Sequence, residues 1–454
     1  MKTDLPCAMS STISKRSKVF ESETIVIDND GGWCWFESSR ALQLGSILLI
    51  GSVASGGNDI IRRGNIELHV YNCTSKSSAR VILKENFELD DHDSPALLLR
   101  PDGRLLAVFA KHGTESKNYL RLSSPNHNEF DKFDPIQTFE PSSTTELTYA
   151  NLYMLPAESN RIYNFFRGLH GSYKPSYIYS DDLGATWHTG NIFIDVPSTE
   201  KHRPYIRYAS NGFDTVHMVY TEAHPRDFDN SLYHIYYRNG YLHRSDGTKL
   251  SSLENGLKTP EQGTRIYPGD SQHVAWIIDV VLDKDGHPVC IYSVQYDSAS
   301  LPIGQGGEDI RYRYARWNED QWHDYSLAFA GCRLYSGEDD YSGLAAIEPD
   351  DPSSVYISTN SDPSTGQPLI SEKDHQRHYE IFHGKTEDYG KTWNWEAITE
   401  NSTIDNLRPV RTQSVKSTEP KEYRALVWLR GKYLAYTDYM QAIVARIWTL
   451  DNED

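Results

Sequence analysis

The chain reads as short apolar and aromatic segments separated by tight polar turns. Residues 94–113 and 151–168 each place two runs of strand-forming residues on either side of a polar turn, which predicts β-hairpins. No long amphipathic helical pattern interrupts this arrangement. The aromatic content, with 30 Tyr, 10 Trp and 14 Phe against 5 Met, also favours strands. The pattern therefore predicts an all-β protein.

The hairpin pattern recurs seven times. The turns are LGS at Gly45, PDGR at Asp102, AESN at Glu158, NGFD at Gly212, KDGH at Asp285, PDDPSS at Asp351 and STEPKE at Glu419. Dividing the 454 residues by seven gives about 65 per unit, enough for four strands. We predict a single-domain, seven-bladed β-propeller over residues 21–454, with a flexible N-terminal extension over 1–20. Successive β-sandwiches are the alternative, but no Gly/Ser-rich or Pro-rich linker separates such domains.

Two segments match the Asp-box pattern S/T-x-D-x-G-x-T-W, which is typical of propellers. They span 180–187 and 386–393. In this motif the Asp accepts hydrogen bonds from turn amides, the Gly permits the bend and the Trp packs between strands. We therefore interpret Asp182 and Asp388 as structural residues.

Composition narrows the function. The net charge of −18 argues against general binding of nucleic acid or of anionic membranes, and no apolar stretch is long enough to span a bilayer. The five cysteines form neither a disulfide framework nor a CxxC motif. The first twenty residues lack the continuous apolar segment of a signal peptide.

Residues equally distant from a hairpin turn meet at its open end. Three consecutive hairpins place chemically versatile residues in this relation: His92 and His112, Tyr149 and Arg167, and Tyr205 and His224. If adjacent blades share one orientation, these six side chains converge on one face of the propeller. Each taken alone is also an ordinary strand-end or packing residue, so the prediction depends on their convergence.

This set of side chains suits proton abstraction next to a carboxylate. An Arg and a protonated His neutralise a uronate carboxylate, and a Tyr or neutral His moves the protons. The six residues include no carboxylate pair of the kind that glycoside hydrolysis uses, and no nucleotide-binding or metalloprotease motif occurs in the chain. The chemistry indicated is β-elimination of a uronic-acid polysaccharide.

The same residues carry a family likeness that runs from about residue 22 to residue 450. The segments that carry it are 31–40, 90–113, 148–155, 161–168, 202–212, 221–227 and 378–393. They resemble the BNR-repeat group that includes the seven-bladed propeller ulvan lyases. The resemblance implies endolytic β-elimination of ulvan, a sulfated polymer of rhamnose and uronic acid, by an exported enzyme, secreted or periplasmic.

The resemblance also implies residue roles. His92 and Tyr149 match the acid and base, in an order that the sequence leaves open, with Tyr153 the alternative to Tyr149. Arg167 matches the residue that neutralises the carboxylate. His112 and Tyr205 match substrate-binding residues, with Tyr208 the alternative to Tyr205.

A structural zinc ion is implied as well, although elimination itself needs no cofactor. His224 and His234 flank a short loop between two expected strands, and Cys290 lies in the second strand of the next unit. All three carry good zinc ligands, but their spacing is not that of a zinc finger. They are equally three ordinary strand residues with a buried cysteine.

Several basic residues are candidates for the binding groove and for contacts with sulfate groups. They are Arg40, Arg62, Arg63, Lys111, Arg203 and Arg207. Of these, Arg40 and Lys111 are the predicted substrate-binding residues. Solvation at the surface is the alternative for each of them.

Two other functions use the same fold. A sialidase-like glycoside hydrolase needs an arginine triad, for which Arg40, Arg167 and Arg333 are available, but it leaves the paired histidines without a role. A non-catalytic carbohydrate-binding propeller needs aromatic platforms and no acid–base pair. We expect a monomer that acts on an anionic sulfated polysaccharide.

Overall fold

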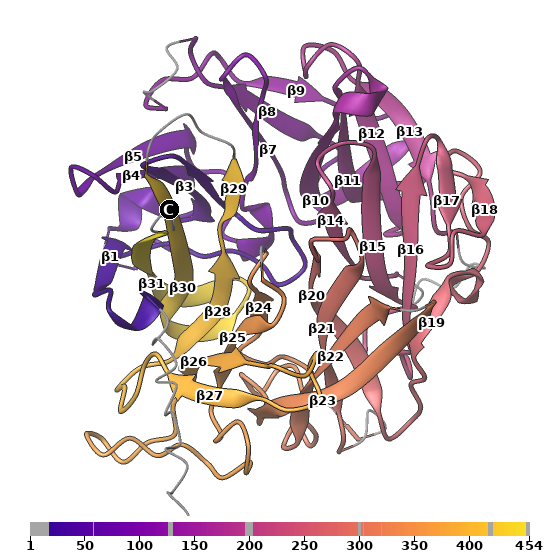
Figure 1. Cartoon of the computed structure of the whole chain (residues 1–454). Coiled ribbons are helices and arrows are strands. Elements are labelled where there is room, and N and C mark those ends of the chain that lie inside the picture. Colours follow the sequence, from indigo (N-terminus) through magenta and orange to yellow (C-terminus); the bar gives the residue numbers. More distant parts are fainter. Residues whose placement is uncertain are drawn as a thin grey trace, which may run out of the picture.

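The computed structural model describes residues 18–57, 59–125, 130–195, 203–297, 301–302, 304–318, 320–349, 351–415 and 421–450. Its strands form seven sheets arranged as blades around a central axis (Figure 1). The predicted all-β, seven-bladed propeller in one domain is confirmed. In this part of the chain no helix has the length and apolar character that crossing a membrane requires.

The first four blades follow the chain in order. Blade 1 contains β2 (Ala41–Leu44), β3 (Ile47–Val53), β4 (Ile66–Asn72) and β5 (Ser77–Lys84). Blade 2 contains β6 (Ala96–Leu99), β7 (Leu105–Ala110), β8 (Asn118–Leu122) and β9 (Gln137–Phe139). Blade 3 contains β10 (Thr144–Leu155), β11 (Arg161–Leu169), β12 (Pro175–Ser180) and β13 (His188–Ile192). Blade 4 contains β14 (Ile206–Ser210), β15 (Thr215–Thr221), β16 (Leu232–Arg238), β17 (Tyr241–His243), β18 (Lys249–Ser252) and β19 (Thr264–Tyr267).

The last three blades complete the ring. Blade 5 contains β20 (Val274–Leu282), β21 (Pro288–Gln295), β22 (Ile310–Asn318) and β23 (Gln321–Gly331). Blade 6 contains β24 (Ala345–Ile347), β25 (Ser354–Thr359), β26 (Glu380–Lys385) and β27 (Asn394–Ala397). Blade 7 contains β28 (Asn406–Arg411), β30 (Glu422–Ala435), β31 (Asp438–Leu450) and β1 (Thr24–Asp28). Strand β29 (Gln413–Val415) pairs in parallel with β2 of blade 1. The short 3-10 turns are η1 (Lys18–Phe20), η2 (Ile60–Arg62), η3 (Asp91–Asp93), η4 (Pro156–Glu158) and η5 (Pro260–Gln262).

The tight turns expected from the sequence set the orientation of the blades. The first six of them join the first and second strands of blades 1 to 6. The seventh, at Glu419, lies outside the described residues. Because consecutive strands are antiparallel, the connections from the second to the third strand lie at the opposite end of each blade. That end is the face on which the candidate residues were expected.

The hydrophobic core is divided between the blades. Seven clusters of buried residues each join two neighbouring blades around the ring. An eighth cluster lies at the centre, where Cys34, Trp35 and Phe36 pack against aromatic side chains from blades 3 to 7. The segment between β1 and β2 therefore fills the middle of the propeller with apolar and aromatic side chains.

The two Asp boxes are structural, as expected. Asp182 accepts hydrogen bonds from the backbone N–H (2.8 Å) and the hydroxyl (2.6 Å) of Thr186. Asp388 makes the same pair of contacts with Thr392, at 2.9 and 2.7 Å. Both motifs join the third and fourth strands of their blades, so they lie on the face of the tight turns.

The packed part of the chain starts close to the boundary predicted at residue 21. Residues 1–17 of the predicted extension lie outside the described part of the chain. Lys18–Phe20 form η1, however, and Val19 is fully buried between blades 6 and 7 against Trp428. The packed part of the chain therefore begins before residue 21, because an apolar side chain there completes an interblade cluster.

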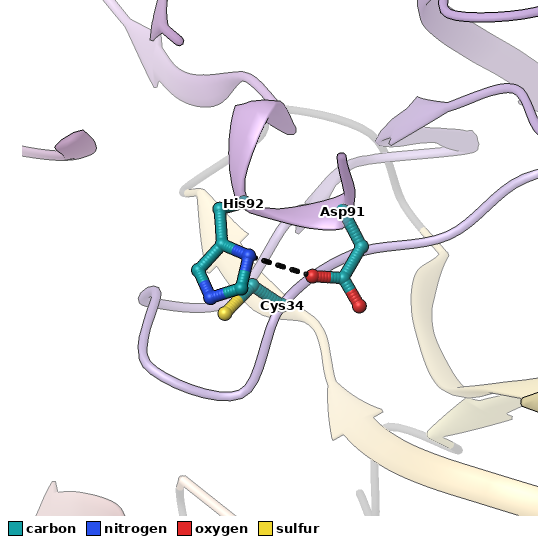
Figure 2. A group of neighbouring side chains, drawn as sticks. All are labelled: Cys34, Asp91 and His92. Atoms are coloured by element: carbon teal, nitrogen blue, oxygen red, sulfur yellow. Dashed lines mark ion pairs between the residues drawn. The ribbon is translucent and has the colours of Figure 1, made fainter. Parts of the chain in front are cut away.

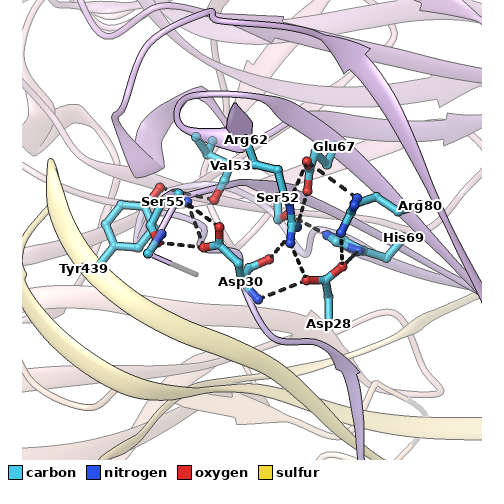
Figure 3. A network of polar contacts seen from close by, with 12 residues as sticks. Asp28, Asp30, Ser52, Val53, Ser55, Arg62, Glu67, His69, Arg80 and Tyr439 are labelled. Carbon is cyan, nitrogen blue, oxygen red and sulfur yellow. Dashed lines mark hydrogen bonds and ion pairs between the residues drawn. The ribbon is translucent and has the colours of Figure 1, made fainter. Parts of the chain in front are cut away.

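Strand β1 closes the ring by pairing with β31, which makes the first strand of the chain the outermost strand of its last blade. A buried network then ties β1 to blade 1 (Figure 3). Arg62 donates to Asp28 (3.0 Å) and to Glu67 (2.6 Å), and His69 and Arg80 lie 3.5 and 3.1 Å from Asp28. Asp28 thus connects blade 7, to which β1 belongs, with blade 1.

We expect Asp28→Asn to lower the free energy of unfolding by about 2 kcal/mol, because it removes a buried partner while Arg62 keeps Glu67. Burial raises the pKa of Asp28, but His69 and Arg62 outweigh it and hold that pKa below its ordinary value. The stabilisation is therefore present above about pH 4 and is lost as the pH falls further. Urea unfolding at several pH values measures both effects.

The matched control is Asp181→Asn, which removes the exposed partner of Arg161. It is expected to change the free energy of unfolding little. The free energies of unfolding of wild type and the Asp28 variant should converge as the pH falls. A difference between them that stays constant in acid contradicts this account of ring closure.

Candidate active site

The three residue pairs predicted from hairpin symmetry converge on one face. His92, in η3, and His112, after β7, stack with ring centroids 3.8 Å apart and planes inclined by 11°. The ring of Tyr149, in β10, lies 5.6 Å from that of His92. Arg167, in β11, donates a hydrogen bond from Nη2 to the Tyr149 hydroxyl (3.2 Å). Blades 2 and 3 thus build one continuous row of side chains.

Blade 4 extends this row. The guanidinium of Arg167 lies between the rings of Tyr149 and Tyr205, 4.6 and 4.5 Å from their centroids. His224 follows with its ring edge-on to that of Tyr205, at 5.5 Å. A small pocket opens here, lined among others by Tyr149, Arg167 and Tyr205. The predicted convergence of all six side chains is confirmed, whereas their roles are not tested by this geometry.

A single carboxylate orients both imidazoles, and sequence reasoning missed it. Asp90 caps η3 and contacts Nδ1 of His92 (2.6 Å) through one oxygen and Nδ1 of His112 (2.9 Å) through the other. With both Nδ1 atoms engaged, each ring exchanges protons with a ligand only through Nε2. The signal in the sequence was the Asp two residues before His92 in the DDH motif.

The two histidines differ in protonation. Burial lowers the pKa of His92, but the neighbouring Cys34 and Asp90 raise it more, so that it lies well above its ordinary value. Burial and the adjacent His92 hold the pKa of His112 below its ordinary value, although Asp90 acts in the opposite direction. Near neutral pH the pair therefore holds one proton, on His92, and leaves His112 a neutral base.

A second acidic residue, Asp91, also contacts the His92 ring. One oxygen of Asp91 lies 3.0 Å from His92 Nδ1, with Cys34 on the other side of the ring (Figure 2). Its second oxygen accepts hydrogen bonds from Arg408 (2.8 Å) and from the hydroxyl of Tyr433 (3.0 Å). Blade 7 thus contributes to the site through a buried charge network, which no turn symmetry in the sequence indicated.

The guanidinium of Arg167 has free donors with which it can bind an anion. Its side chain is buried, and its Nε and Nη1 have no hydrogen-bond partner among the described residues. A buried guanidinium with unused N–H groups costs free energy unless a ligand satisfies them. A planar carboxylate matches the two-pronged geometry of these donors.

Tyr149 is held in a strained backbone conformation. Its φ of 74° lies in the left-handed region, which is uncommon for a bulky residue. The pairing of β10 with β11 is irregular at this point, since the register shifts between Thr148 and Asn151. Such bulges turn a side chain away from the sheet and are common at functional sites. Burial raises the pKa of Tyr149 well above its ordinary value despite Arg167, so the phenol keeps its proton.

The alternative tyrosines are placed less directly, although Tyr208 lines the same small pocket. The Tyr153 hydroxyl lies 2.6 Å from the Ser38 hydroxyl and donates to the carbonyl of Tyr208 (3.1 Å). Both tyrosines belong to the buried cluster between blades 3 and 4. Tyr149 and Tyr205, rather than Tyr153 and Tyr208, are therefore the residues that lie beside Arg167.

Arg40 is not a groove residue, which corrects the sequence-based prediction. Its side chain is 2% exposed, forms an ion pair with Glu37 and donates to the carbonyl of Ala150 (2.8 Å). Arg62 is likewise buried in the network of ring closure. Arg207 binds the backbone carbonyls of residues 35 and 37. These guanidinium groups satisfy internal acceptors, a role that basic composition alone does not distinguish from ligand binding.

Lys111, Arg63 and Arg203 remain accessible. Lys111 precedes His112, lies 3.7 Å from Glu115 and has a side chain 27% exposed. Arg203 lies 3.8 Å from Asp227, and its side chain is 28% exposed. Arg63 is exposed. Their contact with a substrate stays a prediction.

The arginines of the alternative sialidase-like triad do not meet. Arg40 is paired with Glu37, and Arg333 with Glu308 at 3.0 Å. Only Arg167 lies with the stacked histidines. The described contacts therefore give no support to a three-arginine carboxylate site.

The predicted zinc ligands do not form a site, which corrects the ligand set of His224, His234 and Cys290. His224 Nδ1 accepts the backbone N–H two residues further along (3.1 Å), so its neutral ring carries the proton on Nε2. His234 contacts Ser245 (2.7 Å) and His217 (3.0 Å) through its two nitrogens. Cys290 is buried in the apolar cluster between blades 4 and 5. These residues do not fit a zinc ion.

The fold and this row of side chains define a β-propeller with a cluster of buried ionisable side chains on one face. The chain belongs to the BNR repeat-containing family, whose model, BNR_4, matches residues 62–330. A comparison with curated proteins finds no match.

Solved structures of similar fold include polysaccharide lyases. One is an ulvan lyase from a new lyase family, PL25, with a TM-score of 0.64 and 13% identity over 93% of this chain and 95% of that one. The same enzyme bound to -[GlcA(1-4)Rha3S]- gives a TM-score of 0.63 at 13% identity, with the same coverage. The polysaccharide lyase Uly1 gives 0.57 and 10% identity over 94% and 99% of the two chains. At these identities the likeness establishes the fold.

Proposed function

We propose that the protein is a polysaccharide lyase that cleaves a sulfated uronate polymer, ulvan or a close relative, by β-elimination. The observation that carries the proposal is Arg167, a buried guanidinium whose Nε and Nη1 have no hydrogen-bond partner among the described residues and which lies beside a phenol and a pair of imidazoles. That combination provides an anion receptor next to groups that accept and donate protons.

In the proposed mechanism, Arg167 and the His92 imidazolium bind the uronate carboxylate and stabilise the negative charge that develops there. The neutral His112 removes the proton from the carbon next to the carboxylate. The electron pair of that C–H bond forms a carbon–carbon double bond as the bond to the glycosidic oxygen breaks. The phenol of Tyr149 donates its proton to the leaving oxygen.

This assignment refines the roles implied by family resemblance. The pKa shifts favour Tyr149 as the acid, since its phenol keeps its proton, and they disfavour His92 as the base, since it holds one. His112, first expected only to assist binding, has the neutral imidazole that a base requires. Tyr205 packs against Arg167 and contributes to binding.

The nature of the polymer is inferred from chemistry and from fold relatives. A ligand with one carboxylate per repeat suits a single unpaired arginine, and sulfate groups suit the accessible Lys111, Arg63 and Arg203. Ulvan is the polymer that the structurally similar lyases are named for. Endolytic action, a monomeric state and export to the periplasm or the medium stay predictions from the same resemblance.

The test is the ultraviolet absorbance of an ulvan digest. Elimination leaves an unsaturated uronate, so absorbance rises as the polymer shortens. Reducing ends without that absorbance indicate hydrolysis instead, and the sialidase-like alternative then replaces the lyase. If neither appears with ulvan or with other uronate polymers, the chain is a binding module.

The pH dependence follows from the two imidazoles. The proposed reaction needs His92 protonated and His112 neutral, so the rate falls in acid through the lowered pKa of His112 and in alkali through the raised pKa of His92. Asp90→Asn removes the carboxylate that raises the pKa of His92, and we expect the alkaline limb of kcat/KM to move down by about one to two pH units. Initial rates across the pH range measure the shift.

The control for this prediction is Asp227→Asn, which removes a carboxylate near Arg203 that does not touch either imidazole. An alkaline limb that stays in place in the Asp90 variant contradicts the assignment of the proton to His92.

A further inference from the structure

We propose that Tyr436, at the tip of the β30–β31 hairpin of blade 7, is a sugar-binding residue of the same site and packs against the sugar unit next to the uronate. The inference rests on the proposed function and adds to it a subsite from a blade that the catalytic row does not use. Neither the sequence motifs nor the family resemblance pointed to this hairpin.

The hairpin tip lies directly beside the stacked histidines. The ring of Tyr436 stands edge-on to both imidazoles, 5.4 Å from His92 and 5.5 Å from His112, with interplanar angles of 87° and 84°. A polymer whose uronate reaches these two rings brings a neighbouring sugar within reach of Tyr436.

The two faces of the hairpin differ sharply. Tyr433 and Tyr439 pair across it and are 4% and 5% exposed in the central aromatic cluster. On the other face Leu434 is 60% exposed and Met440 52%, and Tyr436 at the tip is 39% exposed. An aromatic ring required only for packing would be buried like its neighbours. Tyr436 instead stays partly exposed where it contacts the two imidazoles, as expected of a ring that meets a ligand.

The hairpin is also held rigidly. The carbonyl of Tyr436 accepts the backbone N–H of Asp91 (3.0 Å), within η3. Tyr433 donates to the Asp91 carboxylate (3.0 Å), and Tyr439 donates to the carbonyl of Val53 (3.2 Å). The platform therefore needs little ordering when a ligand binds, which favours affinity.

The chemistry of Tyr436 suits a sugar. The faces of a pyranose ring expose C–H groups that pack on an aromatic surface, and its hydroxyls accept or donate hydrogen bonds to a phenol. Lys432, exposed on the same strand two residues before Leu434, adds a cation within the same face for a sulfate or carboxylate. The expected occupant is a sulfated sugar unit rather than a protein.

The test compares Tyr436→Ala and Tyr436→Phe with wild type in polymer binding, measured by calorimetry, and in steady-state kinetics. We expect the alanine variant to bind ulvan about tenfold more weakly and to raise KM about tenfold, with kcat changed less than about threefold. The phenylalanine variant keeps the ring and is expected to stay within about threefold of wild type. If the alanine variant fails to fold, Tyr436→Leu takes its place.

The matched control is Tyr389→Ala. Tyr389 is 67% exposed in the Asp-box turn between β26 and β27, on the opposite face of the propeller. Its replacement by alanine is expected to leave binding and turnover unchanged. Unaltered binding in the Tyr436→Ala variant overturns the inference. So does a loss confined to kcat with a shifted pH profile, because it would mean that Tyr436 only supports the imidazoles.

Binding separates this inference from the proposed function. If the wild type binds ulvan without forming the unsaturated product and the alanine variant binds weakly, the subsite stands and the lyase mechanism fails. If the wild type forms the product and the variant binds normally, the mechanism stands and the subsite fails. A wild type that binds no uronate polymer overturns both.

Discussion

Replacing Arg167 by alanine is expected to reduce kcat/KM for elimination by about a hundred- to a thousandfold, the usual loss when a donor that stabilises developing charge is removed. The protein itself is expected to stay folded. Arg167 is buried, but it donates to the hydroxyl of Tyr149 and packs on Tyr205, and no described carboxylate is left unpaired by its removal. Assays of elimination beside thermal unfolding measure the two effects separately.

Arg167→Lys distinguishes charge from geometry. Lysine keeps the positive charge but not the two-pronged donor, so we expect an intermediate loss that appears mainly in KM. The matched control is Arg238→Ala, which removes an exposed arginine paired with Asp214 in blade 4 and is expected to leave activity unchanged. An Arg167→Ala protein that is folded and fully active contradicts the site.

Replacing Tyr149 by phenylalanine is expected to lower kcat by about a hundred- to ten-thousandfold, the range that general acid catalysis contributes. The change removes only the hydroxyl, which accepts a hydrogen bond from Arg167, so the ring still fills its place in the central cluster. We expect KM to change little, since the substrate carboxylate still meets Arg167. Steady-state and single-turnover kinetics on ulvan measure the loss.

Tyr153→Phe is the matched control, because it removes a buried hydroxyl of the same strand that serves packing. That hydroxyl contacts Ser38 and the carbonyl of Tyr208, and its loss is expected to cost about 1 kcal/mol of stability without reducing turnover. Loss of turnover in the Tyr153 variant with activity retained in the Tyr149 variant would reverse the assignment.

The sequence predicts the row of six side chains because strand pairing carries geometric information. Two residues at equal distances from a turn become neighbours in an antiparallel hairpin, as Tyr149 and Arg167 do through the pairing of Thr148 with Arg167. Propeller blades repeat this relation around the axis, so a pattern in three hairpins becomes a row on one face.

The remaining errors have a common physical cause. Whether a charged side chain faces solvent or a buried partner depends on contacts between blades, which no local pattern records. Arg40 is satisfied by Glu37 and by a carbonyl of blade 3, and the supposed zinc ligands are satisfied by ordinary hydrogen bonds and apolar packing. Tyr436 was missed for the same reason, since it meets the histidines only when blade 7 closes beside blade 1.

Ring closure has a consequence for biosynthesis. Strand β1 is synthesised before the other strands of the propeller, yet its partner β31 is the last of them, and the central segment of Cys34 and Trp35 follows β1 directly. The platform on which His92 rests, including Arg408 and Tyr433, also comes from the final blade. The nascent chain therefore lacks the complete candidate site until blade 7 has been made, and products of premature termination before blade 7 are expected to be inactive.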